Sequence, residues 1–100
     1  TMDFSVYILF SEKLAKFYIG TTDNVDKRLL EHNTGKYKTA FSTKGIPWTL
    51  FMNIPCSSSK QAYDLEAFIK KMKSANFVRR LKKQPEIISS VLEKLESHKR

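Results

Sequence analysis

The sequence of 100 residues predicts an α+β fold, in which a small three-stranded antiparallel sheet is flanked by helices. Three stretches alternate apolar and polar residues with the period of a β-strand, at residues 4–10, 16–20 and 48–54. Other segments repeat apolar residues with the spacing of an α-helix. Three strands cannot bury both faces of a sheet by themselves, so we expect these helices to cover it.

The first two strands are expected to form a hairpin. We place Tyr7 opposite Tyr18, which sets Phe10 opposite Ala15 and leaves residues 11–14 as a turn of common length. In this register both tyrosines lie on one face, and the other face carries Val6, Ile8, Phe17 and Ile19. A slip by one residue would break this agreement.

A helix is expected after the hairpin, capped by Thr22 or Asp23 and ended by Gly35. Val25 and Leu29 define its inward stripe. At the margin of that stripe, one turn apart, lie Arg28 and His32. The residues expected to point away are Lys27 and Glu31. A polar loop over residues 34–47 then leads to the third strand.

The second half of the chain predicts three helices. The serines at 57–59 can cap the first of them, over residues 60–73, with Glu66 at the edge of its apolar stripe. A short helix is expected over residues 76–82. Pro85 opens the last helix, because proline is well accommodated in a first helical turn.

The charge of the chain favours an anionic partner. Lysine and arginine number 18 against 10 acidic residues, which gives a net charge of +8. An anionic membrane is disfavoured, because no helix opposes a basic face to large exposed aromatic residues, and no apolar run approaches the ~18 residues of a membrane span. We therefore expect nucleic acid as the partner and no membrane association.

Cysteine usage indicates a reducing compartment. Cys56 is the only cysteine, which excludes an intrachain disulfide, and no Cys/His cluster suggests structural zinc. No signal peptide is visible at the start of the sequence. These features predict a cytoplasmic protein.

Basic residues are concentrated over residues 70–83, where no acidic residue interrupts them. This stretch is either a solvated helix face or a surface that tracks phosphates. Its members are Lys70, Lys71, Lys73, Arg79, Arg80, Lys82 and Lys83. Lys36, Lys38 and Lys44 of the polar loop can add to the same surface.

Five residues form a set suited to cutting a phosphodiester with one metal ion: Tyr7, Tyr18, Arg28, His32 and Glu66. Hairpin alternation and helix phase are expected to place all five toward a common side, on one concave surface. Each also has an ordinary structural explanation. The tyrosines can be strand aromatics, and His32 can cap helix carbonyls. Arg28 can pair with Glu31, and Glu66 with Lys70.

Several short motifs, in order, give the chain a resemblance to a known family. It resembles the GIY-YIG nuclease domain family, of the small stand-alone type, from about Val6 to Leu81. The matching pieces are Ser5-Val6-Tyr7, Tyr18-Ile19-Gly20, the segment Arg28 to Asn33, Thr43-Lys44-Gly45 before Pro47-Trp48, and Ala62 leading to Glu66 and Lys70-Lys71.

The resemblance implies metal-dependent hydrolysis of nucleic-acid phosphodiesters, and we expect a nuclease domain over residues 4–83. The C-terminal helix over residues 84–98 lies beyond the resemblance and is expected to pack on the same domain. Glu66 would bind Mg²⁺ or Mn²⁺, and a single carboxylate can suffice because magnesium keeps most of its waters. Arg28 would hold a non-bridging oxygen.

The resemblance leaves the general base open. Tyr7 or Tyr18 would orient the attacking water or take its proton. Because a phenol ionises only near pH 10, a positive charge must ease that step, or His32 must act instead.

Two departures from the family pattern bear on activity. Ser5 stands where the first motif has glycine, and a later asparagine that many members use has no secure counterpart. The resemblance still implies an endonuclease that cleaves DNA, selects structure rather than sequence, and acts in repair or recombination. The alternative is a weakly active or inactive nucleic-acid-binding module. The C-terminal helix can close the core or contact a protein partner.

Overall fold

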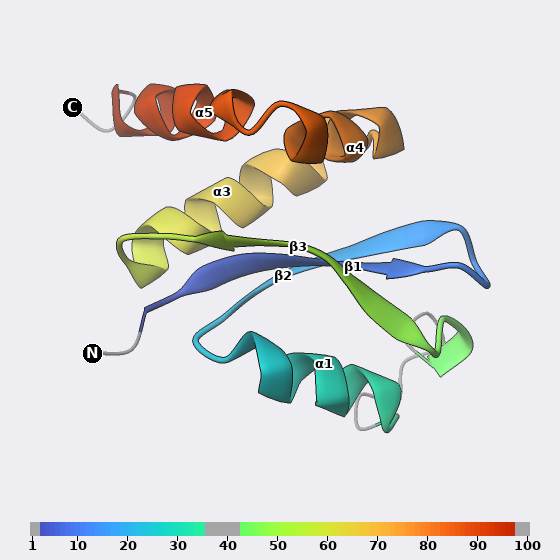
Figure 1. Ribbon diagram of the computed structural model, residues 1–100. Coiled ribbons are helices and arrows are strands. Elements are labelled where there is room, and N and C mark those ends of the chain that lie inside the picture. Colours follow the sequence, from blue (N-terminus) through green and yellow to red (C-terminus); the bar gives the residue numbers. More distant parts are fainter. Residues whose placement is uncertain (1–2, 36–42, 98–100) are drawn as a thin grey trace.

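The middle layer of the structure is a three-stranded antiparallel sheet (Figure 1). The structure is a computed structural model and describes residues 3–35 and 43–97. The strands are β1 (Ser5–Ser11), β2 (Lys16–Thr22) and β3 (Trp48–Pro55), and β1 is central. The predicted α+β class is therefore confirmed.

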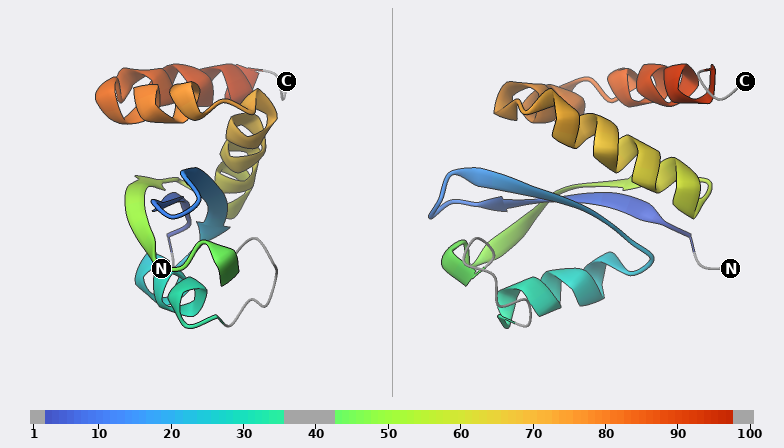
Figure 2. Two further views of the ribbon diagram at one scale, coloured as in Figure 1. Left: turned by 90° about the vertical axis from the view of Figure 1, so that its right-hand side faces the viewer. Right: turned by 180° about the vertical axis from the view of Figure 1, so that it is seen from behind.

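Helices cover both faces of the sheet. Beneath it in Figure 1 lies α1 (Val25–Asn33), and the end-on view of Figure 2 shows the helices that follow β3 on the opposite face. These are α3 (Ser59–Met72), α4 (Ala75–Lys83) and α5 (Glu86–Ser97). Among the described residues, no helix has both the length and the apolar character needed to cross a bilayer.

The hairpin register differs from the predicted one by two residues. Tyr7 pairs with Gly20 and Tyr18 with Leu9, so the turn occupies residues 12–15. Ser11 remains in the ladder, and its hydroxyl accepts a hydrogen bond from the amide of Leu14 at 3.1 Å. A shift by two keeps every side chain on its predicted face, because side chains alternate with period two.

The cap of α1 is Asn24 rather than Thr22 or Asp23. Its side chain accepts a hydrogen bond from the Lys27 amide at 3.1 Å. Thr22 belongs to β2 instead, and its hydroxyl accepts from the Asn24 amide at 3.0 Å. Gly35 has a φ of 76°, a conformation that favours glycine, which confirms it as the stop of this helix.

The main core lies between the sheet and the helices above it. Ser58 caps α3 by accepting from the Gln61 amide, and this helix buries Ala62, Leu65 and Ile69 against the sheet. From α5, Val91 is buried in the same cluster. The last helix thus packs on the core formed by the rest of the chain.

Candidate active site

Tyr7, Tyr18 and His32 meet on the face of the sheet that α1 covers. The Tyr7 hydroxyl lies 3.2 Å from Nε2 of His32. The ring of Tyr18 stands edge-on to that of His32, with centroids 4.5 Å apart, and lies 5.9 Å from the ring of Trp48. We call these four residues the tyrosine cluster.

Asn33 fixes the end of α1 against β3 and thereby supports the tyrosine cluster. Its side-chain amide donates to the carbonyl of Trp48 at 2.9 Å and accepts from the amide of the same residue at 2.5 Å. Two hydrogen bonds to one residue define both position and orientation. The helix residue next to Asn33, which is His32, is thus held at a fixed depth over the sheet.

His32 is buried, with 1% of its surface exposed, although it was expected at the margin of the helix. The physical reason is its spacing: residues 25, 29 and 32 continue one inward stripe. Burial lowers the pKa of His32, the charge of Arg28 lowers it further, and Glu31 opposes this shift. The imidazole is therefore neutral at pH 7.

Arg28 and Glu31 lie together beside a hollow of about 320 Å³, which Thr21 and Tyr63 also line. Nη1 of Arg28 is 4.0 Å from Oε1 of Glu31. The side chain of Glu31 is only 13% exposed, so the expectation that it points away was wrong. We call this cavity the Arg28 hollow.

Glu66 lies on α3, and so on the opposite face of the sheet from the tyrosine cluster. The Thr21 hydroxyl donates to Oε1 of Glu66 at 2.5 Å, and Nζ of Lys70 lies 2.6 Å from Oε2. The expectation that all five candidate residues share one side is therefore wrong for Glu66. Thr21 is three residues from Tyr18 in β2, and an odd separation in a strand places two side chains on opposite faces.

β2 is an outer strand of the sheet. At its free edge, the face that carries the tyrosine cluster and the face that carries Glu66 nevertheless come near each other. A second hollow, of about 560 Å³, is lined by Tyr18, Lys70 and Lys73 among others, and we call it the Tyr18 hollow. Glu66 contacts one residue of each cavity, Lys70 in the Tyr18 hollow and Thr21 in the Arg28 hollow. A polymer strand lying along this edge can therefore approach Tyr18, Arg28 and Glu66 together.

The donor set at Glu66 fits a mostly hydrated cation and not an all-protein cage. In the part of the chain that the structure describes, no group of three or more His, Cys, Asp or Glu side chains could hold a metal ion. Glu66 offers one carboxylate, 17% exposed, whose second oxygen is paired with Lys70. Magnesium often binds through one or two carboxylates, several waters and substrate phosphates, which such a site can accept.

The sequence did not identify Thr21 as a neighbour of Glu66. Thr21 directly follows the Tyr18-Ile19-Gly20 motif, and strand alternation would have placed it on the face opposite Tyr18. The pairing of Lys70 with Glu66 was considered as an ordinary helix contact, and the structure contains it. Both residues turn out to contact the candidate metal ligand.

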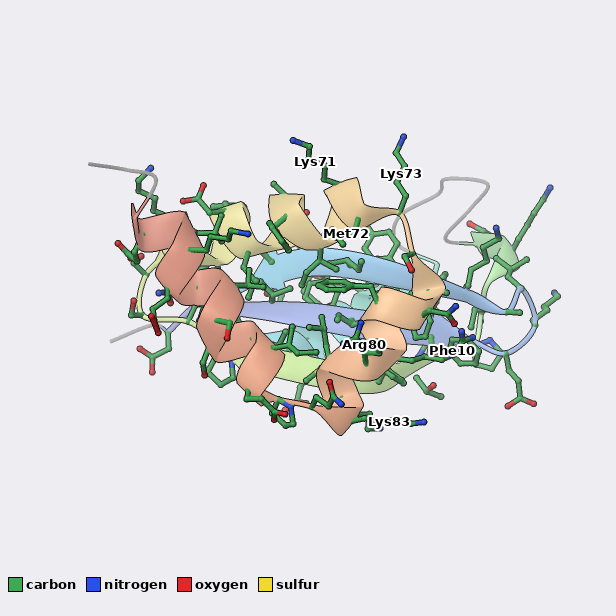
Figure 3. The ribbon with its side chains drawn as sticks, turned by 90° about the horizontal axis from the view of Figure 1, so that it is seen from above. Phe10, Lys71, Met72, Lys73, Arg80 and Lys83 are labelled. Atoms are coloured by element: carbon green, nitrogen blue, oxygen red, sulfur yellow. The ribbon has the colours of Figure 1, made fainter. Side chains whose placement is uncertain are left out.

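The basic residues of the predicted stretch are divided between α3 and α4. Lys73 ends α3 in the left-handed conformation, with a φ of 48°, and the chain then turns into α4. In Figure 3, Lys73 and Lys83 lie on opposite sides of the helical layer. Lys44 and Arg80 are exposed. The remaining predicted contacts, Lys36 and Lys38, lie outside the described residues.

Comparison with known proteins agrees with this architecture. Residues 3–82 match the family model described as the GIY-YIG catalytic domain. A UPF0213 protein of Syntrophus aciditrophicus (strain SB) is 39% identical over 82 residues, which cover 81% of this chain and 92% of that protein. No solved structure matches significantly. The chain belongs to the GIY-YIG catalytic domain family, a family of nucleases.

Proposed function

We propose that this protein is a divalent-metal-dependent endonuclease that hydrolyses DNA phosphodiesters and selects DNA structure rather than sequence, in repair or recombination. The observation that carries the proposal is the position of Glu66 beside the β2 edge, between the hollows that contain Tyr18 and Arg28. The net charge of +8 supports a polyanionic substrate. Among the described residues no element resembles a groove-reading recognition motif, which favours backbone and shape recognition.

Arg28 is the residue best suited to hold the phosphate. Its guanidinium remains charged at every relevant pH and offers several donors in one plane. The 4.0 Å separation from Glu31 is long for a hydrogen-bonded ion pair, so the contact with Glu31 orients Arg28 without a close bidentate pair. The side chain is 37% exposed and can meet a substrate oxygen.

Tyr18 and the Tyr7–His32 pair supply groups that orient water and accept a proton. Neutral His32 can take a proton from the Tyr7 hydroxyl 3.2 Å away, and both side chains are almost fully buried. Tyr18 lines the Tyr18 hollow and touches His32 through its ring edge. We assign Tyr18 to orient the attacking water.

Glu66 is the residue that would hold magnesium or manganese. When bound there, the cation supplies positive charge that stabilises the phosphate and the leaving oxygen. Thr21 keeps the carboxylate in place, and Lys70 must release Oε2 for this to happen.

A second candidate function is binding without efficient cleavage. The observation that favours it is that both oxygens of Glu66 are already engaged, one by Thr21 and one by Lys70. Ser5, which stands in the position of the first-motif glycine, also favours binding without efficient cleavage. In this alternative Lys70 keeps Glu66 neutralised and the protein only docks on nucleic acid.

One comparison separates the two functions. Wild type, Glu66→Gln and the control Glu96→Gln, which changes an exposed carboxylate on α5, are purified identically. Each is incubated with branched, single-stranded and duplex DNA in Mg²⁺ or Mn²⁺. We expect wild type and Glu96→Gln to nick branched DNA and Glu66→Gln to bind but not nick it. Tight binding by wild type with no nicking of any substrate would favour the binding module.

A further inference from the structure

A hollow of about 290 Å³ lies on the helical side of the sheet, near the lower limit of ~300 Å³ for pockets that take small organic groups. It is distinct from the Arg28 and Tyr18 hollows. In Figure 3, Phe10 lies beside α4, and Lys83 lies at the end of that helix. We call it the phenylalanine hollow, and its lining residues are Phe10, Phe17, Phe51, Arg79, Lys82 and Lys83.

The three phenylalanines form one aromatic patch, and each strand contributes one of them. Phe10 and Phe17 are a cross-strand pair with centroids 5.0 Å apart. Phe51 meets Phe17 edge-on at 4.9 Å. All three rings are half-buried, so the patch presents aromatic surface to the hollow instead of being sealed inside the core.

The basic residues of α4 stand directly over this patch. Cζ of Arg79 is 5.5 Å from the centroid of Phe17, and Nζ of Lys82 is 4.7 Å from that of Phe51. Residues 79, 82 and 83 are three and four positions apart, which places them on one face of the helix. Exposed cation–π contacts of this kind are weak, so these long side chains can move from the rings to a phosphate.

We propose that the phenylalanine hollow binds an unpaired nucleotide of a single-stranded nucleic-acid segment. The base stacks on the phenylalanine patch, and the adjoining phosphates pair with Arg79, Lys82 and Lys83. Aromatic platforms bordered by positive charge are the usual means of binding single strands, because every base has a face that can stack. A base inside a duplex has both faces covered by its neighbours and cannot use the patch. Binding at this hollow rests on the proposed function only in taking nucleic acid as the ligand, whereas the substrate preference that follows from it also rests on the proposed cleavage.

The position of Phe17 connects this hollow with the candidate active site. Phe17 lines both the phenylalanine hollow and the Tyr18 hollow. A strand held at the β2 edge can therefore continue from one cavity into the other. The preferred substrate is then a nucleic acid with an unpaired segment adjoining the bond to be cleaved.

Fluorescence of 2-aminopurine tests the stacking directly, because this base analogue is quenched when it stacks. The probe is an oligothymidylate with one 2-aminopurine, compared with the same strand paired in a duplex, in EDTA so that no cleavage occurs. We expect quenching on addition of wild type to the single strand and tighter binding of the single strand than of the duplex. Binding should weaken as salt rises.

Variants at Phe10 test whether the ring of this residue is part of the surface on which the base stacks. Phe10 belongs to neither of the two core clusters formed by the described residues, so changing it should disturb folding least. Phe10→Leu should abolish much of the quenching and weaken single-strand binding by roughly 5- to 100-fold. Phe10→Tyr keeps an aromatic face and should bind as wild type does. Thermal melting of each variant checks that the fold is retained.

Charge variants identify the phosphate contacts. Lys82→Ala and Lys60→Ala remove the same charge, but Lys60 lies at the start of α3 and outside the lining of the hollow. Lys60→Ala measures the effect of losing one positive charge. Lys82→Ala should weaken single-strand binding by more than Lys60→Ala does.

The inference is wrong if the probe is not quenched, if Phe10→Leu quenches it fully, or if Lys60→Ala and Lys82→Ala weaken binding equally. Displacement of an unquenched probe by polyglutamate would indicate an acidic peptide site instead. Cleavage is measured separately with Glu66→Gln. Stacking without cleavage supports this inference and counts against the endonuclease, and cleavage without stacking does the reverse.

Discussion

Gly20 lies directly beneath the ring of Tyr7. The two residues are paired across β1 and β2, and a β-carbon built on Gly20 would lie 2.5 Å from the Tyr7 hydroxyl oxygen. The glycine of the Tyr18-Ile19-Gly20 motif therefore makes room for the tyrosine of the other motif. This contact also sets the height at which the Tyr7 hydroxyl meets His32.

Gly20→Ala should displace Tyr7 and destabilise the protein by about 1–3 kcal/mol, the usual cost of overpacking a dense site. The expected signature is coupling, measured by urea unfolding in a double-mutant cycle. In a Tyr7→Ala background the ring is absent, and Gly20→Ala should cost nothing or stabilise the strand slightly. Equal costs in both backgrounds would mean that the backbone, and not Tyr7, requires the glycine.

The lowered pKa of His32 predicts a pH dependence of stability. The unfolded chain protonates this histidine as pH falls through about 6.5, whereas the folded protein keeps it neutral to lower pH. The unfolded state then binds more protons, so stability is full above pH 6.5 and falls as pH drops below it. Urea midpoints between pH 8 and 5 should show this fall in wild type and a shallower one in His32→Gln. The same slope in both proteins would assign the effect to other groups.

Thr21→Val tests whether the threonine hydroxyl positions Glu66. The change keeps the shape of the side chain and removes the donor at 2.5 Å. We expect weaker magnesium binding, so that cleavage needs more metal to reach its half-maximal rate, because a half-buried carboxylate loses its orienting partner. Thr49→Val is the control, since that exposed hydroxyl donates to a strand carbonyl at 3.3 Å and touches no candidate residue. A similar shift in both variants would contradict the positioning role.

Lys70→Ala tests whether Lys70 competes with the cation for Glu66. Its ammonium pairs with Oε2 at 2.6 Å, so its removal should lower the magnesium concentration needed for half-maximal cleavage while weakening DNA binding. Lys71→Ala removes the same charge from a side chain that points outward in Figure 3. It should weaken binding without changing the metal requirement. Identical metal titrations of the two variants would show that Lys70 acts only through its charge.

The sequence predicted the elements well because alternation, caps and breakers act locally. Each described strand and helix lies within a few residues of its predicted bounds. The hairpin register was wrong by two because side-chain alternation cannot distinguish registers that differ by a full period. The packing of Tyr7 on Gly20 favours the observed register, and this contact is visible in three dimensions alone.

The sequence identified the residues of the candidate site better than it predicted how they are arranged in space. Helix phase gives the side of α3 that points inward, but it does not give the face of the sheet that α3 covers, and this is why Glu66 was placed on the wrong face. The burial of His32 was within reach of the sequence, because residues 25, 29 and 32 have the spacing of one stripe. The contact between Thr21 and Glu66 joins segments 45 positions apart and has no local signal.

Arg28→Ala tests the phosphate-holding role by comparison with its neighbour. Arg28 and Lys27 both line the Arg28 hollow, but Arg28 is 37% exposed and held beside Glu31, whereas Lys27 is an exposed cation. Both changes remove one positive charge, so general attraction for DNA falls equally. We expect Arg28→Ala to lower the single-turnover rate at saturating DNA by at least ~10²-fold, as loss of one preorganised charge-stabilising group does. Lys27→Ala should change only the salt-dependent affinity. Equal single-turnover rates in the two variants would remove Arg28 from the chemical step and leave it a role in binding alone.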